Sequence, residues 1–177
     1  AALFATAETG KKGQFLAGAP GWTQYDEQII HNLGLNLEVV YAGSEEAILA
    51  AVESAYRRKE PILFYFWTPH SIHAEYDLTE VKLPEYTDEC YAGVAEGHTD
   101  DIACDYPEDK LFKIFWAGLE DAYPDVFAFL SNMKYTTEDQ IAMVAAVELD
   151  GLTPEEAAEA WIEENEDVWR EWLPDTE

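Results

Sequence analysis

The sequence has few basic residues and no long apolar run. Ten lysines and arginines stand against 37 aspartates and glutamates in 177 residues, which gives a net charge of −27. This charge argues against nucleic acid and anionic membrane surfaces as partners, because both attract basic patches. No apolar run approaches the roughly 18 residues of a membrane-spanning helix. There is no Met start, charged n-region or cleavage site, so we expect that any signal peptide lies outside this sequence, which looks like a piece of a longer protein.

The composition does allow a folded core. Hydrophobic residues make up 48% of the chain and aromatic residues 14%, and 177 residues suit one domain or one lobe with an appendage. Acidic residues at this density repel one another, and salt screens that repulsion. We therefore predict a saline working environment, with an ordinary acidic secreted protein as the alternative.

Cysteine is scarce. Cys90 and Cys104 are the only two, and both lie in a polar stretch with neither helical nor alternating periodicity. Two loop cysteines without another thiol indicate one disulfide and an extracytoplasmic location. The alternatives are two free thiols, or a metal site with His98, although a metal would need more ligands than this loop offers.

The first 70 residues predict the order strand–helix–strand–helix–strand. Short apolar segments indicate the strands, at residues 13–18, 37–41 and 61–67. The third contains an unbroken apolar run and is predicted to be buried on both faces, as in a parallel sheet. Right-handed crossovers make such a sheet parallel, and in the common doubly wound order the first and third strands are neighbours.

Capping residues predict where the helices begin and end. Thr23 is the expected N-cap of the first helix and Gly34 its end, and Ser44 is the expected N-cap of the second, which ends at the cations 57–59. The other expected elements are a helical turn at 71–76, strands at 78–83 and 109–114, and helices at 119–130, from Thr137 to about 151, and from Thr153 onward, the last two with capping boxes.

Two tryptophans stand at the predicted carboxyl edge of this sheet. Trp22 follows the first strand through Pro-Gly, and Trp67 ends the third. Neighbouring strands would bring both to one crevice, where indole faces can hold a quaternary ammonium cation. The backbone amides of Thr23 and Gln24 can hold a carboxylate at the start of the helix. Together these features predict a site for a betaine, with two core tryptophans as the alternative.

Other aromatic residues have structural interpretations. Trp161, Trp169 and Trp172 recur on the last predicted helix and its continuation, and we expect them to be packing residues. Phe115 and Trp116 follow a predicted strand and are also expected in the core.

His70 and His73 form an H-x-x-H pattern with Glu75 and Asp77 nearby. This pattern suggests a metal or acid–base site, but the spacing is common by chance and no third ligand stands at a convincing distance. We expect His70 to support the crevice loop. Because phosphate loops and nucleophile elbows are also lacking, we predict no metal, no cofactor and no enzymatic activity, with a small hydrolase using His70 and Asp77 as an alternative.

Several segments resemble the substrate-binding proteins of ABC transporters for glycine betaine and proline betaine. They are GAPGWTQYD (18–26), ILFYFWTPHSIHAEYDL (62–78), YTDEC (86–90), CDYP (104–107) and the tail from TTEDQ to WREWL. The resemblance implies an α/β fold, namely a three-layer αβα lobe of the type II periplasmic-binding-protein-like fold with C-terminal helices. It implies Trp22 and Trp67 as cage residues and Thr23 and Gln24 as carboxylate-binding residues, and we add His70, as the support of the crevice loop, to the predicted ligand-binding residues. Ser71 stands where relatives often carry a bulky aromatic residue.

The same resemblance implies an organisation and partners. Residues 1–12 would connect from a missing preceding lobe, 13–114 would form the ligand-binding lobe, and 115–177 a helical tail packing on or near it. The implied ligand is glycine betaine or a related betaine or choline, and the implied partners are an ABC permease and the second lobe. The location would be extracytoplasmic, in the periplasm or on the outer face of the membrane. The alternative is a sensory or regulatory domain for the same ligand class.

Overall fold

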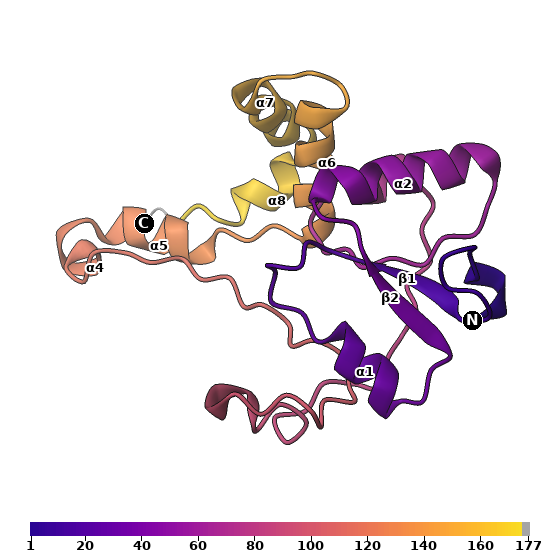
Figure 1. Ribbon diagram of the computed structural model, residues 1–177. Helices are drawn as coiled ribbons and strands as arrows, with labels where there is room; N and C mark the ends of the chain where they lie inside the picture. The colour runs from indigo at the N-terminus through magenta and orange to yellow at the C-terminus, as the bar shows by residue number, and fades with distance from the viewer. Residues whose placement is uncertain (175–177) are drawn as a thin grey trace. The chain divides into compact units, whose positions relative to one another are not determined.

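A computed structural model describes residues 1–174, which form two compact units. The first contains residues 1–66 and 80–108, and the second contains residues 67–79 and the chain from 109 onward. The first unit holds the sheet and the cysteine loop, and the second is helical (Figure 1). Residues 67–79 and 109–114, which the sequence pattern groups with the sheet, thus belong to the helical unit.

The sheet of the first unit is parallel, as predicted. Strand β1 (Gly13–Ala17) pairs with β2 (Leu37–Tyr41), and β1 forms an isolated parallel bridge to Phe64 through Leu16. The Leu16 amide donates to the Leu63 carbonyl (2.9 Å), and the Tyr65 amide donates to the Leu16 carbonyl (2.9 Å). The spatial order is therefore second–first–third, the order expected for a doubly wound sheet.

The third segment is less regular than predicted. It makes only that bridge, and residues 62–67 are half-buried rather than buried on both faces. The physical reason is that β1 is its one strand neighbour among residues 1–174, and a strand needs partners on both edges and cover on both faces to be fully buried.

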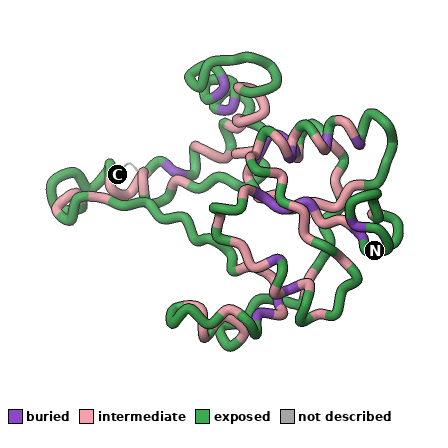
Figure 2. The backbone as a smooth tube through the Cα atoms, viewed as in Figure 1, coloured by how far each residue is buried: buried purple, intermediate pink, exposed green. Residues whose placement is uncertain are grey.

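Two helices flank the strands. Helix α1 (Asp26–Asn32) lies below them and α2 (Glu45–Arg58) above them in the view of Figure 1, which gives three layers. The Ser44 hydroxyl caps α2 by accepting from the Ala47 amide (3.3 Å), as predicted. Figure 2 shows buried positions along β1 and α2, and in α2 these are Ile48, Val52 and Ala55. Their helical spacing places them on one face, toward the sheet.

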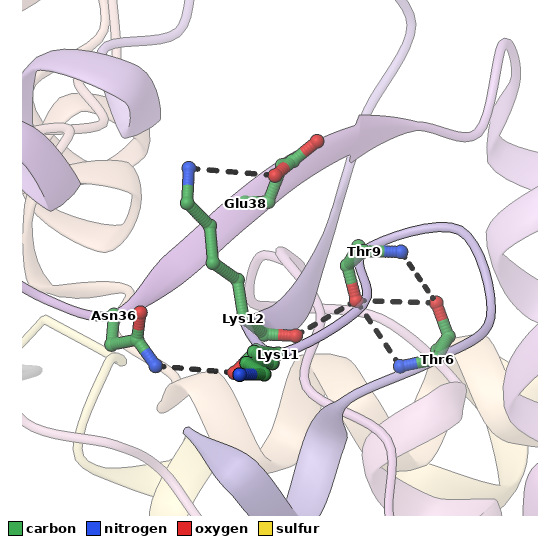
Figure 3. Close-up of polar contacts among 6 residues, drawn as sticks. All are labelled: Thr6, Thr9, Lys11, Lys12, Asn36 and Glu38. Atoms are coloured by element: carbon green, nitrogen blue, oxygen red, sulfur yellow. Dashed lines mark hydrogen bonds and ion pairs between the residues drawn. The ribbon is translucent and has the colours of Figure 1, made fainter.

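The N-terminal segment is part of the first unit. It contains the 3-10 helix η1 (Ala2–Phe4) and a turn that leads into β1. Figure 3 shows the polar contacts that hold the turn: the Thr9 hydroxyl donates to the Lys12 carbonyl (2.8 Å) and lies 3.3 Å from the Thr6 hydroxyl. Lys12 also pairs with Glu38 of β2 (3.4 Å). These contacts tie the segment to the start of the sheet.

The second unit is built from short helices. They are α3 (Ile72–Glu75), α4 (Leu119–Ala122), α5 (Pro124–Asn132), α6 (Thr137–Glu148), α7 (Pro154–Glu164) and α8 (Glu166–Arg170). Trp161 and Trp172 are buried and stacked, with ring centroids 5.6 Å apart, so these two predicted packing residues are confirmed. No helix within residues 1–174 is both long and apolar enough to cross a bilayer.

Capping boxes begin α6 and α7. The capping box of α7 joins Thr153 and Glu156 as predicted, with Pro154 at the first helical position. In α6 it joins Thr136 and Asp139, one residue earlier than predicted. The predicted helix at 119–130 is divided at Pro124, because proline cannot donate the hydrogen bond that would continue α4.

The two strands predicted in this region are wrong, and so is the core position predicted for Trp116. Neither residues 78–83 nor residues 109–114 form a strand, because no described segment pairs with them. The Trp116 side chain is 66% exposed and thus not in the core, while Phe115 is half-buried with its ring 5.9 Å from that of Phe127. Trp169 is half-buried beneath the guanidinium of Arg170.

Candidate functional site

The loop of residues 19–24 holds Trp22, and because Trp22, Thr23 and Gln24 are predicted to contact a ligand it is here called the ligand loop. The Ala19 carbonyl accepts from both the Trp22 amide (2.9 Å) and the Gln24 side-chain amide (2.8 Å), which closes the turn at Pro-Gly. The Trp22 ring rests on Gly18, where an added Cβ would lie 2.2 Å from a ring carbon. The ring is half-buried and meets Tyr65 edge-on, with centroids 6.5 Å apart. Trp22 is therefore held by a turn, a glycine and a second aromatic ring.

Thr23 is not the helix N-cap that was predicted. Helix α1 begins at Asp26 with Tyr25 as its N-cap, and the Thr23 side chain is exposed and makes no capping bond. The amides of Thr23 and Gln24 thus belong to the ligand loop instead of the first helical turn. No residue in the described range 1–174 accepts a hydrogen bond from either amide. Their role as donors to a ligand stays a prediction, which no longer relies on a helix dipole.

A buried carboxyl group follows the ligand loop. Asp26 is 7% exposed, and its Oδ1 accepts from the Tyr106 hydroxyl (3.0 Å) while its Oδ2 has no hydrogen-bond partner in the described part of the chain. The Asp26 pKa is raised to about 6, chiefly by burial and to a smaller extent by the charge of Glu27, against the lowering effect of the Tyr106 hydrogen bond. Burial and the Asp26 charge in turn raise the pKa of Tyr106.

Tyrosines extend the aromatic surface away from Trp22. The Tyr65 ring lies 6.0 Å from that of Tyr106, which stacks on Tyr25 at 6.0 Å, and Tyr25 meets Tyr91 edge-on at 5.6 Å. Tyr65 lies in the predicted buried strand at 61–67, and the sequence patterns assign the other three tyrosines no role. A signal was present in the CDYP segment, because Tyr106 stands two residues after a cysteine.

The predicted disulfide is confirmed: Cys90 and Cys104 are bonded, with their Cα atoms 6.5 Å apart. Cys104 and the preceding Ile102 are buried. The Asn32 side-chain amide, at the end of α1, donates to the carbonyls of Asp100 (2.7 Å) and Ile102 (2.9 Å). The disulfide loop (residues 90–104) therefore contacts both ends of α1, through Asn32 at its end and through the Tyr25–Tyr91 ring contact at its N-cap.

In the second unit, two histidines support the segment after Trp67. The Trp67 ring is half-buried and lies 5.5 Å from the His70 ring, nearly perpendicular to it. The buried His70 ring accepts at Nδ1 from the Ile72 amide (3.1 Å), and His73 Nε2 lies 2.9 Å from the Trp67 carbonyl. Residues 1–174 contain no group of three or more side chains placed to hold a metal ion.

Residues 1–164 match the family described as the substrate-binding domain of the ABC-type glycine betaine transport system. The chain belongs to this family. It is 30% identical over 169 residues to a trimethylamine N-oxide-binding protein of Pelagibacter ubique (strain HTCC1062), covering 94% of this chain and 52% of the relative. It is 29% identical over 134 residues to the glycine betaine/carnitine transport binding protein GbuC of Listeria monocytogenes serotype 1/2a (strain 10403S). This match covers 76% of this chain and 39% of the relative. The chain thus spans about half or less of the length of these relatives.

Solved structures agree on the fold of this family member. Lactococcal OpuAC, closed on glycine betaine, matches 91% of the chain and 57% of its own length, with a TM-score of 0.58 and 21% identity. The glycine betaine/L-proline-binding protein ProX of Borrelia burgdorferi matches 92% of the chain and 56% of its own length, with a TM-score of 0.53 and 19% identity. The expected α/β lobe of the type II periplasmic-binding-protein-like fold is therefore confirmed.

The family assignment leaves the residue roles as predictions. Trp22, Thr23 and Gln24 lie in the first unit, whereas Trp67 and His70 lie in the second. The aromatic cage that would join Trp22 to Trp67 remains a prediction, as do the carboxylate contacts of the loop amides.

Proposed function

We propose that this chain is the ligand-binding part of an extracytoplasmic substrate-binding protein, which captures glycine betaine or a related quaternary-ammonium osmoprotectant for import by an ABC permease. Support comes from the family match and from relatives named for trimethylamine N-oxide and for glycine betaine and carnitine. These compounds share a methylated nitrogen that carries positive charge and offers no N–H donor. Aromatic faces suit such a group.

The observation that carries the proposal is the construction of the ligand loop. A half-buried indole rests on Gly18 and Tyr65, directly before two amides that have no acceptor among residues 1–174. In the proposed complex the methylated ammonium packs on Trp22, and the carboxylate accepts from the amides of Thr23 and Gln24. We also propose Trp67 and His70 as ligand-binding residues, as the resemblance and the sequence pattern predict.

A second lobe would complete this protein. Phe112, Ile114 and Trp116 are 78%, 91% and 66% exposed, and they alternate with Lys113 and Phe115, whose side chains contact the α5 region. Alternation of this kind is typical of a strand with one covered face, and exposed apolar patches mark interaction surfaces. We propose that this face packs against the second lobe, with residues 1–12 leading from that lobe.

The disulfide and the charge fit the proposed location. A single disulfide is typical of oxidising compartments, and a net charge of −27 is best tolerated where salt screens it. Glycine betaine is a zwitterion, so this charge neither attracts nor repels it strongly. The acidic surface and the ligand would then be separate adaptations to one saline environment.

Isothermal titration calorimetry with glycine betaine, choline and trimethylamine N-oxide tests the function, using the chain alone and joined to its second lobe. Trp22→Ala and Trp67→Ala are each expected to weaken binding by about 10-fold or more, since a cation–π contact contributes up to about 2 kcal/mol. Trp169→Ala, on α8, is the matched control and should leave affinity unchanged. Wild-type affinity in Trp22→Ala would remove the ligand loop from the site.

A further inference from the structure

We propose that Tyr106 is a positioning residue for the ligand loop, held in place by the disulfide loop. The proposal rests on the proposed function of the ligand loop and adds a residue that does not itself touch the ligand. Tyr106 acts through its hydroxyl on the backbone after the loop, and through its ring on the aromatic residues beside Trp22.

The hydroxyl of Tyr106 joins two consecutive residues. It accepts from the Tyr25 amide (2.6 Å) and donates to Asp26 Oδ1 (3.0 Å). The Tyr25 amide belongs to the peptide plane that begins at Gln24, so this bond orients the end of the ligand loop. The hydroxyl thus fixes the backbone between α1 and the proposed carboxylate donors, which are the amides of Thr23 and Gln24.

The ring of Tyr106 supplies a second route to Trp22. It stacks on Tyr25, with an interplanar angle of 28°, and packs against Tyr65 at 6.0 Å. Tyr65 in turn meets the Trp22 ring edge-on at 6.5 Å. Aromatic pairs at these distances stabilise one another beyond the area they bury. Displacing the Tyr106 ring would therefore release Tyr65 and the indole that rests against it.

The disulfide loop explains why Tyr106 stays in position. Cys104, two residues earlier, is buried and bonded to Cys90. Asn32 binds the carbonyls of Asp100 and Ile102, and the Asp105 amide donates to the Pro84 carbonyl (2.8 Å). The segment from 100 to 106 is thereby fixed on both sides of the disulfide, and Tyr106 is its last fixed residue before Pro107.

Protonation of Asp26 provides a readout that is specific to this contact. The groups facing Asp26 are Glu27 on its own helix, Tyr91 of the disulfide loop, Tyr106 just after that loop, and Tyr41 of β2, and none of them is cationic. A protonated carboxyl group is a weaker acceptor than a carboxylate. Affinity for glycine betaine should therefore decrease as the pH falls through about 6, the value to which burial raises the Asp26 pKa.

Tyr106→Phe keeps the ring and removes both hydrogen bonds, so it is the test variant. Tyr86→Phe is the matched control, because its hydroxyl donates only to the exposed Asp88 (3.0 Å). Amide hydrogen exchange at residues 22–25 is measured by NMR without ligand, and glycine betaine affinity by calorimetry from pH 5 to 8. We expect Tyr106→Phe to accelerate exchange of the Tyr25 amide about 10-fold, to weaken binding, and to abolish its pH dependence.

A purely structural role would lower the melting temperature without flattening the pH profile. Asp26→Asn is a second variant that keeps only an uncharged acceptor for Tyr106, so it should bind as the wild type does at low pH, with no pH step. Unchanged exchange at Tyr25, or an unchanged pH profile, in Tyr106→Phe would overturn the positioning role. A wild-type protein that binds no betaine even when joined to its second lobe would instead refute the proposed function, and the exchange measurement would still decide the role of Tyr106.

Discussion

Replacing Asp26 by asparagine is predicted to stabilise the chain at neutral pH. The carboxyl group is 7% exposed, has one unpartnered oxygen among the described residues, and lies near Glu27. Its pKa is raised from 3.8 to about 6, chiefly by burial. Above pH 6 the folded chain must therefore hold a buried carboxylate that the unfolded chain exposes to water.

The magnitude follows from the difference in pKa between the two states. A shift of roughly two units, at about 1.4 kcal/mol each, lowers the free energy of unfolding by about 3 kcal/mol above pH 6. Between about pH 4 and 6 the folded chain binds more protons than the unfolded chain, so stability falls as the pH rises through this interval. Asparagine removes the charge and keeps the acceptor for Tyr106. Its amide nitrogen lacks a partner, which costs about 1 kcal/mol, so the expected net gain at pH 8 is about 2 kcal/mol.

Urea unfolding of the wild type and Asp26→Asn at pH 4, 6 and 8 measures this effect, in about 1 M NaCl to screen the remaining charges. The stability difference between the two proteins should grow by about 3 kcal/mol from pH 4 to 8. Glu27→Gln, at the exposed neighbouring position, is the control and should show a much smaller dependence. A difference that is constant with pH, or that favours the wild type more at pH 8, would refute the reasoning.

Three further predictions concern salt, the disulfide and the support of Trp22. The melting temperature should rise from low to molar salt, because screening weakens the repulsion within a chain of charge −27, and a flat response would contradict the saline environment. Cys90→Ser should lower the free energy of unfolding, measured without reductant, by about 3 kcal/mol, and equal stability would show that the closed loop contributes little. Gly18→Ala should displace the Trp22 ring and weaken glycine betaine binding by about 10-fold or more, whereas Gly21→Ala, where an added Cβ meets nothing within 4 Å, should not.

The elements that could be predicted from the sequence are those with local causes. Ser44 accepts from the third amide after it, and the apolar positions of α2 recur on one face, so both ends and the buried face of this helix could be predicted. The capping box of α7 is equally local, since Thr153 and Glu156 lie within one turn. Signals of this kind need no knowledge of the rest of the chain.

The elements that were missed depend on distant partners. Residues 109–114 include the apolar Leu111, Phe112 and Ile114, but a strand exists only where another strand pairs with it, and no described segment does so. Thr23 has the right side chain for an N-cap. The Tyr25 amide, however, is bound by Tyr106, 81 residues away, and α1 begins only at Asp26. The long-range hydrogen bond thus outweighs the local preference of threonine for the N-cap position.

The residues of the candidate site also differ in whether local sequence or distant partners position them. Trp22 could be found because the Pro-Gly turn that positions it is adjacent in sequence, whereas Tyr106 owes its position to Cys104 and to contacts with α1. The disulfide itself was predictable from cysteine count, and a residue two positions from a disulfide has little freedom to move. A tyrosine in that place can therefore hold a distant loop with one hydroxyl, which a tyrosine in an unrestrained loop could do only at a larger cost in conformational entropy. In a chain with a single covalent cross-link, the polar residues beside it are the first candidates for positioning a ligand loop.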